Sequence, residues 1–248
     1  MNKIIIYSLI ILSLASCNQT QKKILIYTRN GEGYVHANIE ASVKALEDIC
    51  QGAGVLTEVS DSAELITGEY LAGFDAVIFC NSNNDAFTSD DQRKAFQEYI
   101  RSGGGFAGIH SACGSERNWP WFWSLLGGKF IRHAPLQPFD IKIIDPDHPS
   151  TSHLPDPWNW EEDECYYLHH LNPDIHVLIA ADLTSVEDEQ RAEFPGTVFG
   201  DLFPLAWCHE FDGGRQWYTA LGHKPEHYSD PYFRNHLKGG ILWVLNMN

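Results

Sequence analysis

Short runs of mainly apolar residues, separated by segments with helical spacing, constrain the fold of this chain more than any other feature of its sequence. Residues 23–28, 55–59, 74–80 and 106–109 form such runs. Strands that are apolar on both faces are typical of a parallel sheet that helices cover on both sides. The alternation therefore predicts an α/β fold, an open and mostly parallel sheet with helices on both faces and right-handed crossover connections.

The segments around these runs support that prediction. Residues 36–50 carry apolar side chains at the spacing of an amphipathic helix. A second helix is expected at residues 89–101, because Ser89 and Gln92 have the form of a capping box. In the second half, Asp212-Gly213-Gly214 is the signal of an antiparallel hairpin. Strands are expected there at residues 139–144, 176–181, 205–211 and 216–221, and a closing helix at residues 232–245.

The N-terminus has the pattern of an export signal. Lys3 is followed by a mainly apolar run at residues 4–14, and the small residues Ala15 and Ser16 precede Cys17. Such a run with these flanks is typical of a signal peptide and is too short to span a bilayer. Its end resembles the lipobox of bacterial lipoproteins, which implies that Cys17 is acylated and anchors the protein to a membrane. An ordinary secretory signal with an incidental cysteine is the alternative.

These features give an expected organisation and location. We expect a lipoprotein signal peptide at residues 1–16, a tether at residues 17–22 and one domain at residues 23–248, held in the cell envelope and facing the periplasm. The chain has 33 acidic and 17 basic residues, a net charge of −16. A surface of that sign repels phosphate backbones, so nucleic acid is not an expected partner. Neutral small molecules remain compatible, and the oligomeric state is left open.

The most informative single residue is His110. Ligands of open parallel sheets bind beyond the carboxyl ends of the strands, and His110 directly follows one expected strand. Residues 108–112 place imidazole where a nucleophile elbow has serine or cysteine between glycines, and Cys113 lacks flanking glycines. Acyl transfer is therefore disfavoured, and acid–base catalysis or metal ligation by histidine is favoured. A histidine that serves only the structure is the alternative.

Other polar and aromatic residues are candidates for the same site. The densest carboxylate cluster, residues 161–164, is either a solvated loop or supplies one carboxylate to the pocket. Trp207 could stack on a sugar ring or pack in the core. No HExxH or HxH spacing occurs, so a local zinc motif is unsupported, whereas a divalent metal ion held by distant loops is left open. Isolated histidines that could reach the site are His36, His133, His209 and His223.

Several multi-residue motifs resemble one known family. Residues 103–112 read GGGFAGIHSA, residues 204–215 read PLAWCHEFDGGR and residues 218–223 read YTALGH. These segments resemble the central and C-terminal motifs of ThuA-like (trehalose utilisation) domains. His36 and the Asp163-Glu164-x-Tyr166 segment match two further positions, although Val35 stands where that family usually has arginine. The resemblance covers residues 23–245, nearly the whole expected domain.

The resemblance implies a fold and a chemistry. The fold would be flavodoxin-like, similar to class I glutamine amidotransferases without their cysteine. The function would be carbohydrate catabolism through 3-keto sugars, as a 3-keto-glycoside hydrolase or lyase. We expect Glu164 or His110 as base and His223 as acid. Tyr166 and Trp207 would shape the sugar site, and His36, His133 and His209 would contact substrate. The alternative from another class is a non-catalytic sugar-binding lipoprotein.

Overall fold

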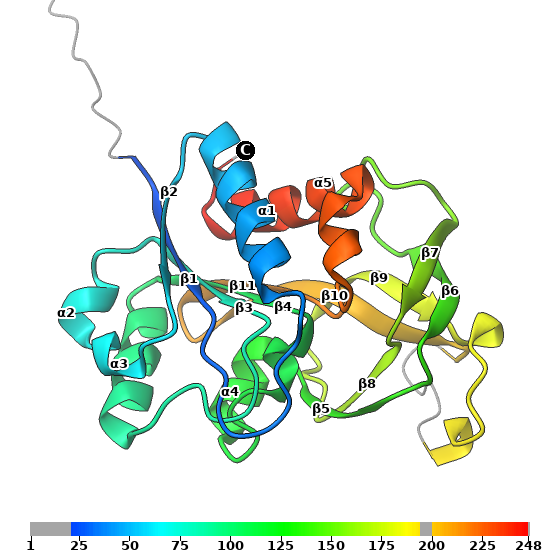
Figure 1. Ribbon diagram of the computed structural model, residues 1–248, viewed down its shortest axis with the longest axis horizontal. Helices are drawn as coiled ribbons and strands as arrows, with labels where there is room; N and C mark the ends of the chain where they lie inside the picture. Colours follow the sequence, from blue (N-terminus) through cyan, green and yellow to red (C-terminus); the bar gives the residue numbers. More distant parts are fainter. Residues whose placement is uncertain (1–20, 194–199, 248) are drawn as a thin grey trace, which may run out of the picture.

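The parallel half of the central sheet carries the first strands of the chain. The computed structural model describes residues 21–193 and 200–247 (Figure 1), and the predicted signal peptide and Cys17 lie outside them. Within the described residues, nine strands form one sheet in the order β2-β1-β3-β4-β11-β10-β9-β6-β7. The first five strands in that order are parallel neighbours: β2 (Leu56–Ser60), β1 (Lys23–Tyr27), β3 (Ala76–Cys80), β4 (Gly105–Ile109) and β11 (Gly214–Thr219).

The other half of the sheet is antiparallel. The hairpin predicted at Asp212-Gly213-Gly214 is present and joins the tenth and eleventh strands, with positive φ at Asp212 and Gly213. A separate two-stranded sheet, β5 (Lys129–His133) with β8 (Tyr166–His169), lies beside this half. The antiparallel strands of the main sheet are β10 (Leu202–Phe211), β9 (His176–Asp182), β6 (Gln137–Ile143) and β7 (Trp158–Asp163).

Helices cover both faces of the parallel half (Figure 1). Phe106 of β4 packs against the rings of Phe96 and Phe122, whereas its neighbour Gly105 lies against Val244. Successive residues of a strand point to opposite faces, so the helices that carry these contacts lie on opposite sides. One side has α1 (Ile39–Gly52) and α5 (Pro231–Val244); the other has α3 (Asp90–Arg101), α4 (Pro120–Leu126) and the short α2 (Gly68–Leu71).

The architecture confirms the predicted fold class, with differences in detail. The first helix begins after Asn38 rather than at His36, which leaves His36 in the preceding loop. Ser89 caps α3 as predicted, accepting a hydrogen bond from the backbone N–H of Gln92. The fifth, seventh and eighth strands were not predicted.

No helix within the described residues combines the length and apolar character needed to cross a membrane. Short 3₁₀ helices are η1 (Ala63–Leu65), η2 (His110–Gly114), η3 (Leu183–Ser185), η4 (Arg191–Glu193) and η5 (Pro225–Ser229).

Candidate functional site

His110 stands at the carboxyl end of β4, beside the end of β11. Ile109 pairs with Thr219, so the imidazole reaches the next residue of the neighbouring strand and Nδ1 donates to the Ala220 carbonyl at 2.7 Å. A carbonyl oxygen only accepts, so Nδ1 carries the proton and Nε2 of the neutral ring presents a lone pair. His110 has a φ of 49°, a left-handed conformation that costs a residue with a side chain about 1–3 kcal/mol and is typical of functional sites.

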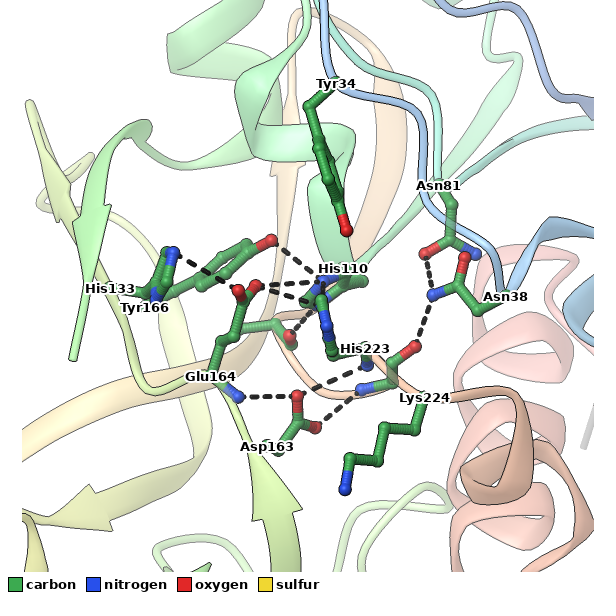
Figure 2. A network of polar contacts seen from close by, with 12 residues as sticks. Tyr34, Asn38, Asn81, His110, His133, Asp163, Glu164, Tyr166, His223 and Lys224 are labelled. Atoms are coloured by element: carbon green, nitrogen blue, oxygen red, sulfur yellow. Dashed lines mark hydrogen bonds and ion pairs between the residues drawn. The ribbon is translucent and has the colours of Figure 1, made fainter. Parts of the chain in front are cut away.

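Side chains from separate segments surround that lone pair (Figure 2). The Tyr166 hydroxyl donates to His110 Nε2 at 2.8 Å, His223 Nδ1 lies 3.4 Å from it, and Glu164 Oε2 lies 3.6 Å from it. The His36 ring packs edge-on against His110, with 4.7 Å between the ring centroids. His36, His110, Glu164 and His223, which we call the His–Glu cluster, each place one potential ligand atom within 4.8 Å of the others.

The two carboxylate oxygens of Glu164 lie near different histidines. Oε2 lies 3.1 Å from His223 Nδ1, and Oε1 lies 3.2 Å from His133 Nε2. His133 Nδ1 donates to the Ala134 carbonyl at 2.7 Å, which fixes the orientation of its ring. The carboxylate is thus held between two imidazoles, one inside the His–Glu cluster and one outside it.

Burial and mutual contact set the charges of the cluster. Burial, and then His223, lower the pKa of His36 to about 4, and burial with His36 lowers the pKa of His110 well below its ordinary value. Burial opposes ionisation of Glu164, but its hydrogen bond to His223 and the neighbouring imidazoles outweigh it and lower the pKa of the carboxyl. The same hydrogen bond raises the pKa of His223. At neutral pH the site therefore combines the neutral imidazoles of His36 and His110 with the Glu164 carboxylate and with His223, whose pKa is raised.

Asp163 ties together the two segments that carry Glu164 and His223. Its side chain is fully buried, and Oδ1 accepts from the backbone N–H groups of Glu164 at 2.7 Å and His223 at 3.3 Å. Oδ2 accepts from the Gly222 N–H at 2.9 Å and from the Trp160 indole at 2.8 Å. The turn after β7 and the loop after β11 are therefore held by one carboxylate (Figure 2).

The loop after β11 is also held from its other side. Asn38 Nδ2 donates to the Gly222 carbonyl at 2.6 Å and to Asn81 Oδ1 at 2.9 Å. Gly222 has a φ of 112°, and a Cβ there would lie 2.7 Å from the Tyr228 hydroxyl, so this position requires glycine. His223 consequently extends from a backbone that is fixed on two sides.

The His–Glu cluster opens onto a cavity of about 310 Å³. That volume is at the lower end of the range for sites that bind small molecules. His36, His133, Glu164, Tyr166 and His223 line the cavity, while His110 is fully buried behind them. Lining residues that the sequence did not indicate individually are Tyr34, Asn83, Ser111, Gly114, Arg117 and Phe130.

Comparison with known proteins identifies the family. The sequence model of the ThuA family, described as trehalose utilisation, matches residues 23–244. The chain belongs to the ThuA family. Among solved structures, it is similar to a ThuA-like protein from Bacteroides uniformis, with a TM-score of 0.73, 25% identity, and coverage of 90% of this chain and 91% of that one. A ThuA-like protein from Parabacteroides merdae has a TM-score of 0.64, 17% identity, and coverage of 91% and 90%. A search of the curated proteins finds no match.

Two residues predicted from the ThuA motifs to contact sugar lie outside the cavity. Trp207 is fully buried in β10, donates from Nε1 to the Leu126 carbonyl at 2.8 Å and packs on Tyr218. His209 Nε2 bonds the Leu125 carbonyl at 2.7 Å and is also buried. Both side chains join β10 to the end of α4, so in this geometry they serve packing, and the cavity is built without them.

The described part of the ThuA domain offers no accessible thiol for acyl transfer. Its five cysteines are all buried and free of disulfides. Burial raises the pKa of Cys113 to about 12, its Sγ lies 3.5 Å from the His110 carbonyl, and Cys113 is not among the residues that line the cavity. The groups that face the cavity can instead accept protons, donate protons or bind a cation.

Proposed function

We propose that this ThuA-family protein is an enzyme of carbohydrate catabolism that cleaves 3-keto-glycosides, disaccharides of the trehalose type in which C3 of one sugar is a ketone. The observation that carries the proposal is the meeting of one carboxylate and several imidazoles on a cavity of about 310 Å³. Family membership supports a sugar as the substrate class. An acid–base route also needs no covalent nucleophile.

The reaction begins at the carbon next to the ketone. A base removes the C2 proton, because the C3 ketone accepts the electron pair as an enolate. The pair then returns to form a C1–C2 double bond, the C1–O bond breaks, and the leaving sugar oxygen takes a proton. Water adds across the double bond, with hydroxyl at C1 and a proton at C2, so the net reaction is hydrolysis.

The cavity supplies a group for each proton transfer. Glu164 is suited to be the base, because its carboxylate lines the cavity, with Oε1 3.2 Å from His133 Nε2. His223, hydrogen-bonded to Oε2 at 3.1 Å, is suited to protonate the leaving oxygen. The second predicted base, His110, is poorly suited, since Tyr166 already donates to its Nε2 and its Nδ1 is bound to Ala220.

An isotope experiment tests the proposal. The purified protein is incubated with 3-keto-trehalose in deuterated water, and the products are followed by NMR and mass spectrometry. We expect release of glucose and deuterium at C2 of the keto sugar. Recovery of the ketone without label and without free glucose would falsify the proposed activity.

A pair of variants separates an enzyme from a binding protein. Glu164→Gln should lower kcat by about 10²–10⁴-fold, the usual contribution of a general base, while the affinity for the keto sugar changes much less. The control is Glu162→Gln, because Glu162 is half-exposed and pairs with Lys224 outside the cavity. A non-catalytic sugar-binding protein would leave the substrate intact with wild type and both variants.

We also propose that Cys17 anchors the enzyme in the cell envelope through a lipid. The basic start, apolar run and small residues before Cys17 support this proposal. Expression with an alkyne-labelled fatty acid should label the wild-type chain and place it in the membrane fraction. Cys17→Ser should abolish both the label and the membrane association. Unchanged fractionation of the variant would contradict lipid anchoring.

A further inference from the structure

We propose that the His–Glu cluster is a binding site for one divalent transition-metal cation such as Zn²⁺. His110, Glu164 and His223 are the ligands held in place, and His36 is a looser fourth. No HExxH motif exists in the sequence, so the site is assembled from four loops that the fold brings to one edge of the sheet. Imidazole nitrogen with a single carboxylate oxygen is a donor set that suits zinc and its neighbours.

The distances between the donor atoms already match a tetrahedral ion. Bonds of about 2.1 Å place two ligand atoms of such an ion about 3.4 Å apart. The corresponding distances are 3.4 Å from His110 Nε2 to His223 Nδ1, 3.1 Å from His223 Nδ1 to Glu164 Oε2, and 3.6 Å from His110 Nε2 to Glu164 Oε2. These three atoms can therefore bind one cation with little movement.

The backbone fixes the most buried ligand in the correct tautomer. His110 Nδ1 donates to the Ala220 carbonyl, which directs the Nε2 lone pair into the cluster. A backbone carbonyl that receives the far N–H of a histidine is the usual support of metal-binding imidazoles. Asp163 adds a second support, because it holds the backbones of both Glu164 and His223.

His36 gives an independent indication of a missing ligand. Its side chain is only 6% exposed, yet its Nδ1 has no hydrogen-bond partner within the described residues. The ring lies against those of His110 and His223, with centroid separations of 4.7 and 5.4 Å. His148, His209 and His227 also have one buried ring nitrogen without a partner, but of these four rings only His36 belongs to the His–Glu cluster, where a cation would give it one.

Loading the site needs two local changes. The cation takes the place of the proton that Glu164 and His223 share, as deprotonation of ligands on metal binding requires. The Tyr166 hydroxyl leaves His110 Nε2 and turns to the Glu164 carboxylate, with which it also interacts.

If the proposed function holds, on which this step rests, the cation would also assist the reaction as an electrophile. With these four ligands the ion could accept a fifth one on the cavity side, where a sugar ketone oxygen would bind and be polarised. The ion would stabilise the enolate oxygen at C3, and His223, as one of its ligands, would no longer protonate the leaving oxygen. Glu164 Oε1 and His133 lie outside the ligand set and remain available for the C2 proton.

Metal binding is tested directly, without an activity assay. The purified protein is stripped with a chelator and titrated with Zn²⁺ by calorimetry and with Co²⁺ by visible absorption, which reports the coordination geometry. We expect one equivalent per chain, Co²⁺ bands of a four- or five-coordinate site, and a higher Tm with metal. His36→Gln should weaken binding modestly, whereas His110→Gln and Glu164→Gln should weaken it by at least about 100-fold.

The control variant is His176→Gln. His176 is exposed and pairs with Asp145 at 2.7 Å, so it matches a His–carboxylate pair that lies outside the cavity. This variant should bind as wild type does. The absence of saturable binding, or binding that Glu164→Gln and His110→Gln both leave unchanged, would overturn the proposal. Tight metal binding together with an inert keto-glycoside assay would leave the metal site standing and remove the proposed activity.

Discussion

Replacing Asp163 by asparagine should destabilise the domain substantially, although the two side chains have nearly the same volume. Oδ1 accepts from the N–H groups of Glu164 and His223, and Oδ2 accepts from Gly222 and Trp160. An amide can place its oxygen on one side only, so in either orientation its NH₂ group faces two N–H donors. At about 1–3 kcal/mol for each buried donor left without an acceptor, the loss is about 2–6 kcal/mol.

Urea denaturation and thermal melting measure this loss. For a chain of this size, 1 kcal/mol corresponds to about 2–4 °C, so Tm should fall by at least about 4 °C. Because Asp163 holds the backbones of Glu164 and His223, Asp163→Asn should also weaken metal binding by about 10–100-fold, as loss of a supporting group does. A destabilisation below about 0.5 kcal/mol would refute the reasoning, since two orphaned buried donors cost more than that.

The neighbouring Glu162 provides the matched control. It lies one residue earlier, is half-exposed and pairs with Lys224 at the surface. Exposed ion pairs contribute about 0–1 kcal/mol, so Glu162→Gln should leave Tm almost unchanged. Equal effects of the two substitutions would mean that the turn, rather than the buried carboxylate of Asp163, determines the stability.

Two further outcomes concern stability. Burial lowers the pKa of His236 to about 3 and of His148 to about 4, from an ordinary 6.5. Below pH 6.5 the unfolded chain therefore binds more protons than the folded chain. The free energy of unfolding, at its full value above that pH, should fall by about 2 kcal/mol per histidine when the pH is lowered to 5. His236→Gln should reduce this pH dependence when unfolding is measured in urea. Gly127→Ala places a Cβ 2.2 Å from Trp207 Nε1 at a φ of 105°, so it should lower the free energy of unfolding by about 2–4 kcal/mol. Gly54→Ala, where φ is 72° and the surrounding space is open, should lower it by only about 1 kcal/mol. Equal melting temperatures of these two variants would contradict the packing argument.

The sequence predicted the parallel half of the fold because its signals there are local. Apolar runs at residues 23–28, 74–80 and 106–109 correspond to strands that are buried on both faces. β4 and β11 pair in parallel, with Ile109 opposite Thr219, so the carboxyl ends of the two strands lie side by side. The residues that follow these two strands, His110 and His223, are therefore predicted to lie at one edge of the sheet.

The remaining parts of the site lack such signals. Trp207 and His209 lie on a strand covered on both sides, and their residue types do not reveal that they pack against the end of α4. Arg117 reaches the cavity from the loop after η2, and Phe130 reaches it from β5, a strand that the sequence did not predict. Positions of this kind depend on tertiary packing, which periodicity does not report. The match of Asp163-Glu164-x-Tyr166 to the family motif, by contrast, singled out Glu164, which the structure places in the His–Glu cluster.

Histidine at the turn after β4 changes the chemistry that this turn can support. The left-handed φ of His110 sets the ring at the edge of the sheet, the Ala220 carbonyl fixes the tautomer, and burial keeps the ring neutral. A thiol in this place would need N–H donors for an oxyanion, whereas the Glu164 carboxylate, 3.6 Å from the His110 ring, opposes negative charge. The strained turn thus presents a fixed lone pair instead of a nucleophile, and a fixed lone pair beside a carboxylate favours a cation or a proton.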